Sequence, residues 1–285
     1  MIINKIEPQG YCGGVKKALN DVYKAIDDPN TPKPIYLLGA IIHNEHVIND
    51  LISKGVILVE DKKKRRVDLI QQIHSGTMVF SAHGVCPEVY KIAKEKKLHI
   101  LDTTCKNVLI VHERIKKHLD LGYTCFYIGT KSHPEAEGVL GISNKIILIN
   151  SISDLEQINV TTPVYVTNQT TLSIYQTNLI YEYIQNNFKN AIIDNKICNA
   201  TTIRQKAILE QNPVDLSLVI GDKTSSNTNK LVEASKSIGI KTFLIEDKSQ
   251  INEIDLTNVN TISISSGAST PSYIVDEVIE ILEKK

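Results

Sequence analysis

The sequence predicts an α/β protein built from three similar modules. Three cysteines, Cys12, Cys105 and Cys198, follow one another at equal intervals of 93 residues (12 to 105 and 105 to 198). After each of them, short apolar runs typical of buried strands alternate with helical runs. Alternation of this kind produces parallel sheets with right-handed crossovers. We therefore expect three α/β modules with parallel sheets, packed as a pseudo-threefold trefoil around a centre where the three cysteines meet.

Three strand-like segments recur in each repeat. The first ends in glycine, the second is rich in β-branched residues, and the third runs into a small polar loop. They cover residues 34–39, 55–59 and 78–84 in the first repeat, 125–129, 145–149 and 164–171 in the second, and 216–221, 241–245 and 262–269 in the third. Ligands of open parallel sheets bind at the carboxyl ends of the strands, so these loops are expected to line a site.

The repeat also predicts the division of the chain. The modules are expected to cover residues 14–104, 105–197 and 198–285, with a strand within residues 1–13 packed on the third module. No linker rich in proline, glycine or serine separates them. Because a unit of this size buries a limited core alone, the modules should pack on one another.

Composition excludes several classes of protein. The formal net charge is zero and 42% of the residues are hydrophobic, which gives no global support for binding nucleic acid or a membrane surface. The sequence shows neither an apolar run long enough to span a bilayer nor a signal-peptide pattern. We therefore expect a cytoplasmic protein without a membrane or nucleic-acid partner. In that compartment, five cysteines favour metal or redox chemistry over disulfides.

One dense cluster of charge occurs, the run Asp61-Lys62-Lys63-Lys64-Arg65-Arg66. The favoured interpretation is a solvated loop. The alternative is a docking patch for an acidic electron carrier.

The repeated cysteines predict a shared metal centre. Cys12 lies in a glycine-rich turn before the helical run 15–26, where backbone N–H groups favour a thiolate. Three thiolates can hold zinc with one open position, or a [4Fe–4S] cluster with one iron lacking a protein ligand. Three buried thiols without metal are the remaining alternative. Cys86, placed on a helix, and Cys125, placed in a strand, have no counterparts and are expected to be packing residues.

The strand-end loops carry polar groups of two kinds. Donors suited to phosphate oxygens come from the first and third modules: His43, His83, Ser225, Ser226, Asn227 and Ser269. The second module offers His133, Glu135 and Thr170 instead. Glu135 is suited to act as a general acid beside a metal-bound substrate. Each residue alone is as typical of a structural histidine or a helix N-cap, but their matching places in three repeats favour a site.

Nine motifs in this chain resemble those of one family. They are Gly10-Tyr11-Cys12-Gly13-Gly14-Val15, His43-Asn44, Ser81-Ala82-His83-Gly84, Asp102-Thr103-Thr104-Cys105, His133-Pro134-Glu135-Ala136-Glu137-Gly138, Gln169-Thr170-Thr171-Leu172-Ser173, Cys198-Asn199-Ala200-Thr201-Thr202-Ile203-Arg204-Gln205, Ser225-Ser226-Asn227-Thr228-Asn229 and Gly267-Ala268-Ser269. The family is LytB, the 4-hydroxy-3-methylbut-2-enyl diphosphate reductases, which carry out the last step of the non-mevalonate isoprenoid pathway.

The resemblance implies a reaction and a set of roles. The reaction is an iron–sulfur reductive dehydration of (E)-4-hydroxy-3-methylbut-2-enyl diphosphate to isopentenyl and dimethylallyl diphosphate, with electrons from ferredoxin or flavodoxin. A central [4Fe–4S] cluster would be ligated by Cys12, Cys105 and Cys198, and its fourth iron would bind the substrate hydroxyl. The diphosphate pocket would comprise His43, His83, His133, Thr170, Ser225, Ser226, Asn227 and Ser269. Proton transfer would fall to Glu135, Thr170 and His133.

Three residues depart from the family pattern beside the cysteines. The chain has Lys17, Lys106 and Asn199 where the family commonly has arginine, proline and an aromatic residue. Each leaves the ligands in place, so we expect altered redox poise or packing. Two other functions compete with the reductase: a redox-neutral dehydratase or synthase on the same scaffold, similar to quinolinate synthase, and a cluster-based redox sensor. The diphosphate donors and the Glu135–Thr170 pair favour the reductase.

Overall fold

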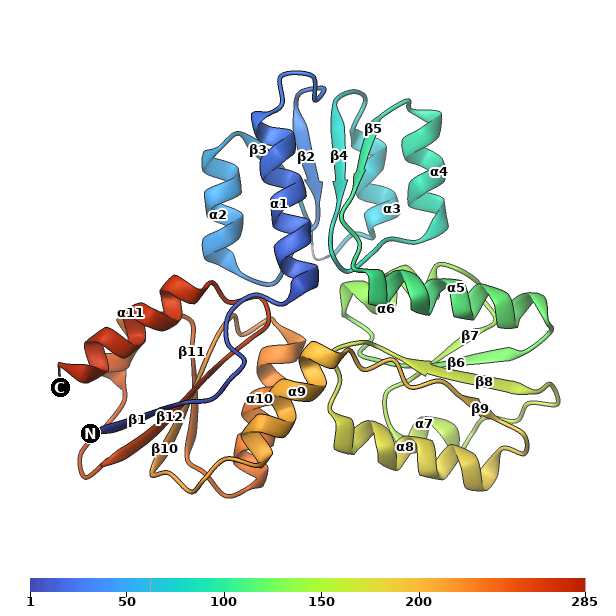
Figure 1. Cartoon of the computed structure of the whole chain (residues 1–285). Coiled ribbons are helices and arrows are strands. Elements are labelled where there is room, and N and C mark those ends of the chain that lie inside the picture. Colours follow the sequence, from blue (N-terminus) through green and yellow to red (C-terminus); the bar gives the residue numbers. More distant parts are fainter. Residues whose placement is uncertain (62, 285) are drawn as a thin grey trace.

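A computed structural model describes residues 1–61 and 63–284. Within these residues the chain forms three parallel sheets of four strands each. Figure 1 shows the sheets around a common centre, each with helices packed against it. The predicted α/β fold of three parallel-sheet modules is confirmed.

The first sheet has the strand order β3-β2-β4-β5. Its elements are α1 (Gly13–Asp27), β2 (Ile35–Leu38), α2 (Glu45–Ser53), β3 (Val56–Val59), α3 (Arg66–Leu69), the 3₁₀ helix η1 (Ile70–Gln72), β4 (Thr77–Phe80), α4 (Pro87–Glu95) and β5 (His99–Asp102).

The second sheet repeats this order as β7-β6-β8-β9. Its elements are α5 (Lys106–Asp120), β6 (Thr124–Ile128), α6 (Pro134–Leu140), β7 (Ile146–Ile149), α7 (Ile152–Leu155), β8 (Val164–Asn168), α8 (Ile174–Asn187) and β9 (Ile192–Ile193).

The third sheet has the order β11-β10-β12-β1, so its fourth strand comes from the other end of the chain. Its elements are β1 (Ile2–Lys5), α9 (Asn199–Leu209), β10 (Leu216–Ile220), α10 (Ser226–Ser237), β11 (Thr242–Ile245), the 3₁₀ helix η2 (Lys248–Glu253), β12 (Thr261–Ser266) and α11 (Ser272–Glu283). β1 pairs in parallel with β12, from Ile2 opposite Thr261 to Lys5 opposite Ile264. The module boundaries at residues 104 and 197 stay predictions.

The apolar patterning explains why these elements form. In α1 the buried residues recur every three or four positions, which puts them on one face of the helix: Val15, Ala18, Leu19, Val22 and Ala25. That face packs on β2 through Ile35 and Leu37. The two inner strands of each sheet, β2 and β4, β6 and β8, and β10 and β12, are almost wholly buried, as expected for parallel strands covered on both faces.

Two strands were not expected from the sequence. β5 and β9 each occupy a sheet edge and directly precede the turn that carries a repeated cysteine. Together with β1, they place Cys12, Cys105 and Cys198 just after the fourth strand of a sheet. Cys125 lies buried in β6, whereas the placement of Cys86 on a helix was wrong by one position, because Cys86 is the N-cap of α4.

The basic run differs from a solvated loop at its last residue. Lys63, Lys64 and Arg65 are exposed, but the side chain of Arg66 is buried at the start of α3. The solvated-loop prediction is therefore wrong for Arg66, and Lys62 lies outside the described residues.

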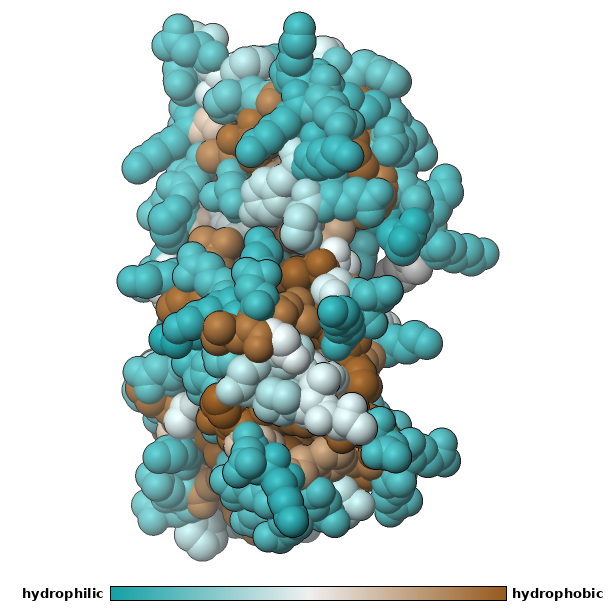
Figure 2. Space-filling view, turned by 90° about the vertical axis from the view of Figure 1, so that its right-hand side faces the viewer, coloured by the Kyte–Doolittle hydropathy of each residue, from teal (hydrophilic) through white to brown (hydrophobic). Residues whose placement is uncertain are grey.

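The surface shows no continuous apolar face on the side drawn in Figure 2, where hydrophilic residues surround separate apolar patches. Among residues 1–61 and 63–284, no helix combines the length and apolar character required to cross a bilayer.

Candidate active site

Each of the three repeated cysteines begins a helix. Cys12, Cys105 and Cys198 are the N-caps of α1, α5 and α9. The Cys12 thiol accepts the N–H of Val15 at 3.5 Å, and the Cys198 Sγ lies 3.2 Å from the Thr201 hydroxyl. Helices from three different parts of the chain therefore point their N-termini at one place.

Gly14 provides direct evidence that thiols of different modules meet. A Cβ at this position would lie 2.9 Å from the Sγ of Cys105 and 3.9 Å from the Sγ of Cys12. Because Gly14 has no side chain, there is open space here, and the two thiols border it. All three cysteines line one inner cavity of about 100 Å³.

Burial sets the protonation of two of the three thiols. Burial raises the pKa of Cys105 and Cys198, and the negative charge of neighbouring thiolates adds to the effect. At Cys105 and Cys198, burial outweighs the backbone N–H groups of the helix starts. Three thiolates can coexist here only around a cationic group. Three soft sulfur donors in this arrangement fit an iron–sulfur cluster.

Arg204 is a positively charged residue near the thiols, and no role could be assigned to it from the sequence alone. Its Nη2 donates to the carbonyl of Gly10 at 2.7 Å and its Nη1 to the carbonyl of Ala200 at 3.1 Å. Attraction to Cys12 and Cys198 opposes the burial that lowers the pKa of its guanidinium. The one feature of the sequence that pointed to Arg204 was its place in the motif that begins at Cys198.

The three residues that depart from the family pattern are exposed. Lys106 and Asn199 are the first residues of α5 and α9, directly after a cysteine. Lys17 lies on α1 and pairs with Asp21 at 2.6 Å. None replaces a thiol, and the predicted effect on redox poise or packing stays a prediction.

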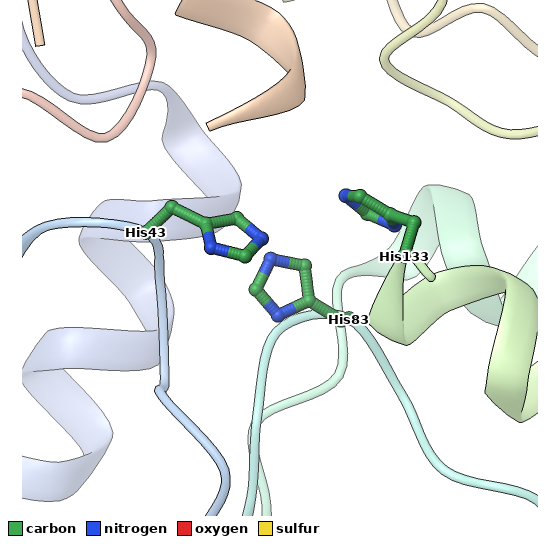
Figure 3. Close-up of side chains that lie close together, drawn as sticks. All are labelled: His43, His83 and His133. Carbon is green, nitrogen blue, oxygen red and sulfur yellow. The ribbon is translucent and has the colours of Figure 1, made fainter. Parts of the chain in front are cut away.

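Three histidines gather beside the cysteines. His43 follows β2, His83 follows β4, and His133 is the N-cap of α6. Their ring centroids are 4.6 Å apart for His43 and His83, and 5.5 Å apart for each of these with His133. Figure 3 shows the rings converging from three separate loops. One ring nitrogen of each lies within 4.8 Å of the others, close enough for a metal ion.

The hydrogen-bond partners of the rings indicate which nitrogens face the cavity. The Nδ1 of His133 accepts the N–H of Glu135 at 3.1 Å, so a neutral ring carries its proton on Nε2. The Thr224 hydroxyl donates to Asp222 at 2.6 Å and lies 3.3 Å from the Nδ1 of His43. That nitrogen therefore donates, and the buried Nε2 of His43 has no partner among the described residues.

Burial keeps the imidazoles neutral. It lowers the pKa of His133 to about 3 and lowers the pKa of His43 and of His83, and the positive charge of Arg66 acts in the same direction on all three. Neutral imidazoles can each offer one N–H or one lone pair, and an arriving anion favours their protonation. The group is therefore suited to an anionic ligand as well as to a metal.

Glu135 is a fully buried carboxyl in a dedicated set of hydrogen bonds. The Thr170 backbone N–H donates to Oε1 and its hydroxyl to Oε2, both at 2.9 Å. The Tyr127 hydroxyl donates to Oε1 at 3.2 Å. Burial outweighs these bonds and raises the pKa of Glu135 to about 7. A carboxyl that is half protonated near neutral pH is suited to general acid catalysis.

The third module contributes hydroxyls that mostly have structural partners. Ser225 accepts the N–H of Thr228 as the N-cap of α10, Ser226 donates to the carbonyl of Thr171 at 3.3 Å, and Ser269 donates to the carbonyl of His43 at 2.9 Å. Asn227 differs, because it is buried and neither its amide nitrogen nor its amide oxygen has a partner in the described part of the chain. An unpaired buried amide points to a polar ligand.

The inner cavity brings together every residue that the sequence analysis placed in the site. Its lining includes Cys12, His43, His83, Cys105, His133, Glu135, Thr170, Cys198, Ser225, Ser226, Asn227 and Ser269. Their individual roles stay predictions. Tyr127 was missed because it lies in an apolar strand, where a buried tyrosine gives no functional signal.

A larger cavity of about 910 Å³ adjoins the inner one. The two share Ile42, His43, His133 and Ser226 in their linings. A ligand of the inner cavity therefore has an approach past the histidines.

Comparison with known proteins agrees with this geometry. The family model described as LytB protein matches residues 3–283. The chain belongs to the LytB family. Two curated LytB relatives are named 4-hydroxy-3-methylbut-2-enyl diphosphate reductase. The protein of Bacillus pumilus is 41% identical over 287 residues, which cover 99% of this chain and 91% of that protein. The protein of Bacillus cereus is 42% identical over 288 residues, covering 100% and 90%.

Solved structures give the same result for the fold. The structure of E-1-hydroxy-2-methyl-but-2-enyl-4-diphosphate reductase from Plasmodium falciparum superposes with a TM-score of 0.91 at 30% identity, covering 99% of this chain and 87% of that chain. A structure of (E)-4-hydroxy-3-methyl-but-2-enyl diphosphate reductase, described as the terminal enzyme of the non-mevalonate pathway, superposes with a TM-score of 0.70 at 29% identity over the whole of both chains. The three-sheet arrangement is thus a LytB fold.

Proposed function

We propose that this chain reduces (E)-4-hydroxy-3-methylbut-2-enyl diphosphate to isopentenyl and dimethylallyl diphosphate, as the last enzyme of the non-mevalonate isoprenoid pathway. The observation that carries the proposal is the content of one cavity: three thiols from three modules, a buried carboxyl with a pKa of about 7, and unpartnered groups suited to phosphate oxygens. The full-length similarity to reductases of that name supports it.

The cofactor that we propose is a [4Fe–4S] cluster held by Cys12, Cys105 and Cys198. Three thiolates leave one iron without a protein ligand, and the bound group would supply a Lewis acid for the substrate hydroxyl together with electrons. Zinc fits three thiolates geometrically, but it has no redox chemistry. A reduction therefore favours iron–sulfur.

The diphosphate would bind where donors and positive potential coincide. His133 presents an Nε2–H, and Asn227 presents an unpaired amide. α10 begins at the cavity, so the positive end of its dipole adds to the attraction. Protonation of His43 on binding would turn its unpartnered Nε2 into a further donor.

Glu135 would supply the proton that leaves with the hydroxyl group. Overall, the allylic C–O bond breaks, two electrons and two protons are consumed, and the oxygen leaves as water. Thr170 would orient the carboxyl through both of its oxygens, and the Tyr127 hydroxyl donates to Oε1 as well. Burial keeps the acid form populated near neutral pH.

We further propose ferredoxin or flavodoxin as the electron donor and the cytoplasm as the compartment. One-electron carriers suit iron–sulfur chemistry, which accepts electrons singly. The redox-neutral alternative similar to quinolinate synthase is not favoured, because the relatives above are named as reductases of the allylic diphosphate.

An anaerobic assay tests the proposal. Protein purified without oxygen should be brown and hold about four irons per chain, and with a reduced viologen it should convert the allylic diphosphate to the two products. Colourless protein with one zinc would contradict the cluster. Brown protein without turnover would contradict the substrate and favour the redox-sensor alternative.

A further inference from the structure

The basic run after β3 ends at Arg66, whose side chain has no role in the proposed reaction. Arg65 is exposed and pairs with Asp68 at 3.3 Å, but its neighbour Arg66 keeps only 6% of its surface exposed. Burying a guanidinium is costly unless its hydrogen bonds and surrounding charges compensate. The hydrogen bonds of Arg66 therefore indicate which part of the structure its burial stabilises.

The guanidinium of Arg66 joins the two halves of the histidine site. Its Nη1 donates to the carbonyl of Gly84 at 3.2 Å and to the carbonyl of Pro134 at 3.3 Å. Gly84 directly follows His83 in the first module, and Pro134 lies between His133 and Glu135 in the second. One nitrogen atom thus connects the loop after β4 to the first turn of α6.

The backbone of Arg66 adds a second connection to α6. Its N–H donates to the Oε1 of Glu137 at 2.8 Å. Gly39, at the end of β2, leaves room for the side chain: its φ is +74°, and a Cβ there would lie 3.1 Å from both Nε and Nη2 of Arg66. A glycine at this position therefore leaves room for a buried arginine at the boundary between two modules.

The charge of Arg66 acts on His83 and His133, whose loops its hydrogen bonds hold, and also on His43. It lowers the pKa of His43, His83 and His133. The charged groups that oppose it are few: Asp222 and Glu60 act on His43, and the histidines otherwise act on one another. Around Arg66 itself lie Glu137, Glu60 and the Cys86 thiol.

We propose that Arg66 is a positioning residue of the substrate pocket, which fixes His83 relative to His133 and Glu135 across the boundary between the first and second modules. This inference rests on the proposed function, because it assigns Arg66 to the pocket for the diphosphate. A planar guanidinium suits the role, since one rigid group reaches two carbonyls while keeping a permanent positive charge beside the anion site.

The test compares Arg66→Met and Arg66→Lys with the neighbouring control Arg65→Met, all as cluster-loaded protein. Steady-state kinetics give KM and kcat, and calorimetry gives the dissociation constant of inorganic pyrophosphate. We expect Arg66→Met to raise KM and the pyrophosphate dissociation constant by about 10-fold or more, as loss of positioning and of a charged partner predicts. Arg65→Met should stay within about twofold, because surface pairs contribute little.

A pH profile separates positioning from general loss of structure. In Arg66→Met the pKa of the imidazoles rises, so the pH dependence of KM moves to higher pH. Arg66→Lys keeps the charge and should keep the profile, with KM raised about fivefold because an ammonium lacks the planar fork. Wild-type KM, profile and pyrophosphate affinity in Arg66→Met would overturn the proposal.

Two further outcomes are also decisive. If Arg66→Met does not accumulate, Arg66→Lys alone decides, and a KM within about twofold of the parent value would overturn the positioning role. If the parent protein binds pyrophosphate but does not turn over the allylic diphosphate, the proposed function fails. The comparison of pyrophosphate affinities still tests Arg66 in that case.

Discussion

Thr170 binds both oxygens of the Glu135 carboxyl, one through its backbone N–H and the other through its hydroxyl, each at 2.9 Å. The carboxyl comes from the start of α6, which connects β6 and β7, and the threonine follows β8 of the same sheet. The pairing fixes the orientation of the one carboxyl in the inner-cavity lining without adding a positive charge to it. Its proton is therefore held by burial and stays available for transfer.

Glu135→Gln should abolish proton transfer while leaving the pocket intact. Glutamine keeps the shape and one acceptor oxygen, but it cannot release a proton. We expect turnover to fall by ~10²-fold or more, with the cluster absorbance and pyrophosphate binding preserved. The matched control is Glu182→Gln, at an exposed position of α8. Equal turnover in the two variants would remove Glu135 from the reaction.

The pKa of Glu135 predicts the pH profile of kcat/KM. A general acid works in its protonated form, which predominates below a pKa of about 7, so kcat/KM should decline as the pH rises through that value. The histidines do not explain such a decline, because the pKa of each is lowered. The residual kcat/KM of Glu135→Gln should not show this decline with rising pH. A profile flat from pH 6 to 9 in the parent would contradict the assignment.

Cysteine variants separate ligands from packing residues. Serine at position 12, 105 or 198 should reduce the iron content and the visible absorbance of the anaerobic protein, because each removes one of three thiolates from a shared centre. Cys86→Ser and Cys125→Ser, which change thiols outside the inner cavity, should retain the cluster. Equal loss of iron in all five variants would refute the shared centre.

Asn227 predicts opposite effects on stability and binding. Leucine at this position removes two buried amide atoms that have no partner in the described structure, so the ligand-free protein should unfold at a higher temperature. Pyrophosphate binding should weaken by about 10-fold, since a donor is lost. Asn229→Leu is the control, because the Asn229 amide already donates to two carbonyls and its loss should destabilise the fold. A lower melting temperature in Asn227→Leu would argue for a structural role.

The repeat made the core of the site predictable. Three cysteines at equal spacing implied three modules and a common centre, and the strand-end positions of His43, His83 and Asn227 implied where their side chains would gather. Both inferences depend on chain topology, which a periodic sequence encodes directly. The inner cavity therefore contains each residue expected in it.

The parts that were missed depend on contacts between distant segments. In the sequence, Arg66 is one more residue of a charged loop, and only its contact with α6 distinguishes it. Tyr127 has the pattern of a core residue, and only its hydrogen bond to Glu135 distinguishes it. β9 pairs through only two residues, which is too short for a periodic pattern. The thiol pKa values depend on burial depth, which local sequence near a helix start does not reveal.

The place of β1 in the third sheet sets an order of events during synthesis. The turn that carries Cys12 is tied to the last sheet strand to be translated: Gly10 donates to the Ser266 hydroxyl at 2.9 Å, and the N–H of Cys12 donates to the carbonyl of Ala268 at 3.0 Å. Cys12, translated early, therefore reaches its place only after Ser266 and Ala268 have been made. The proposed cluster, which needs all three cysteines, could therefore be completed only after β12 and the loop that follows it have emerged.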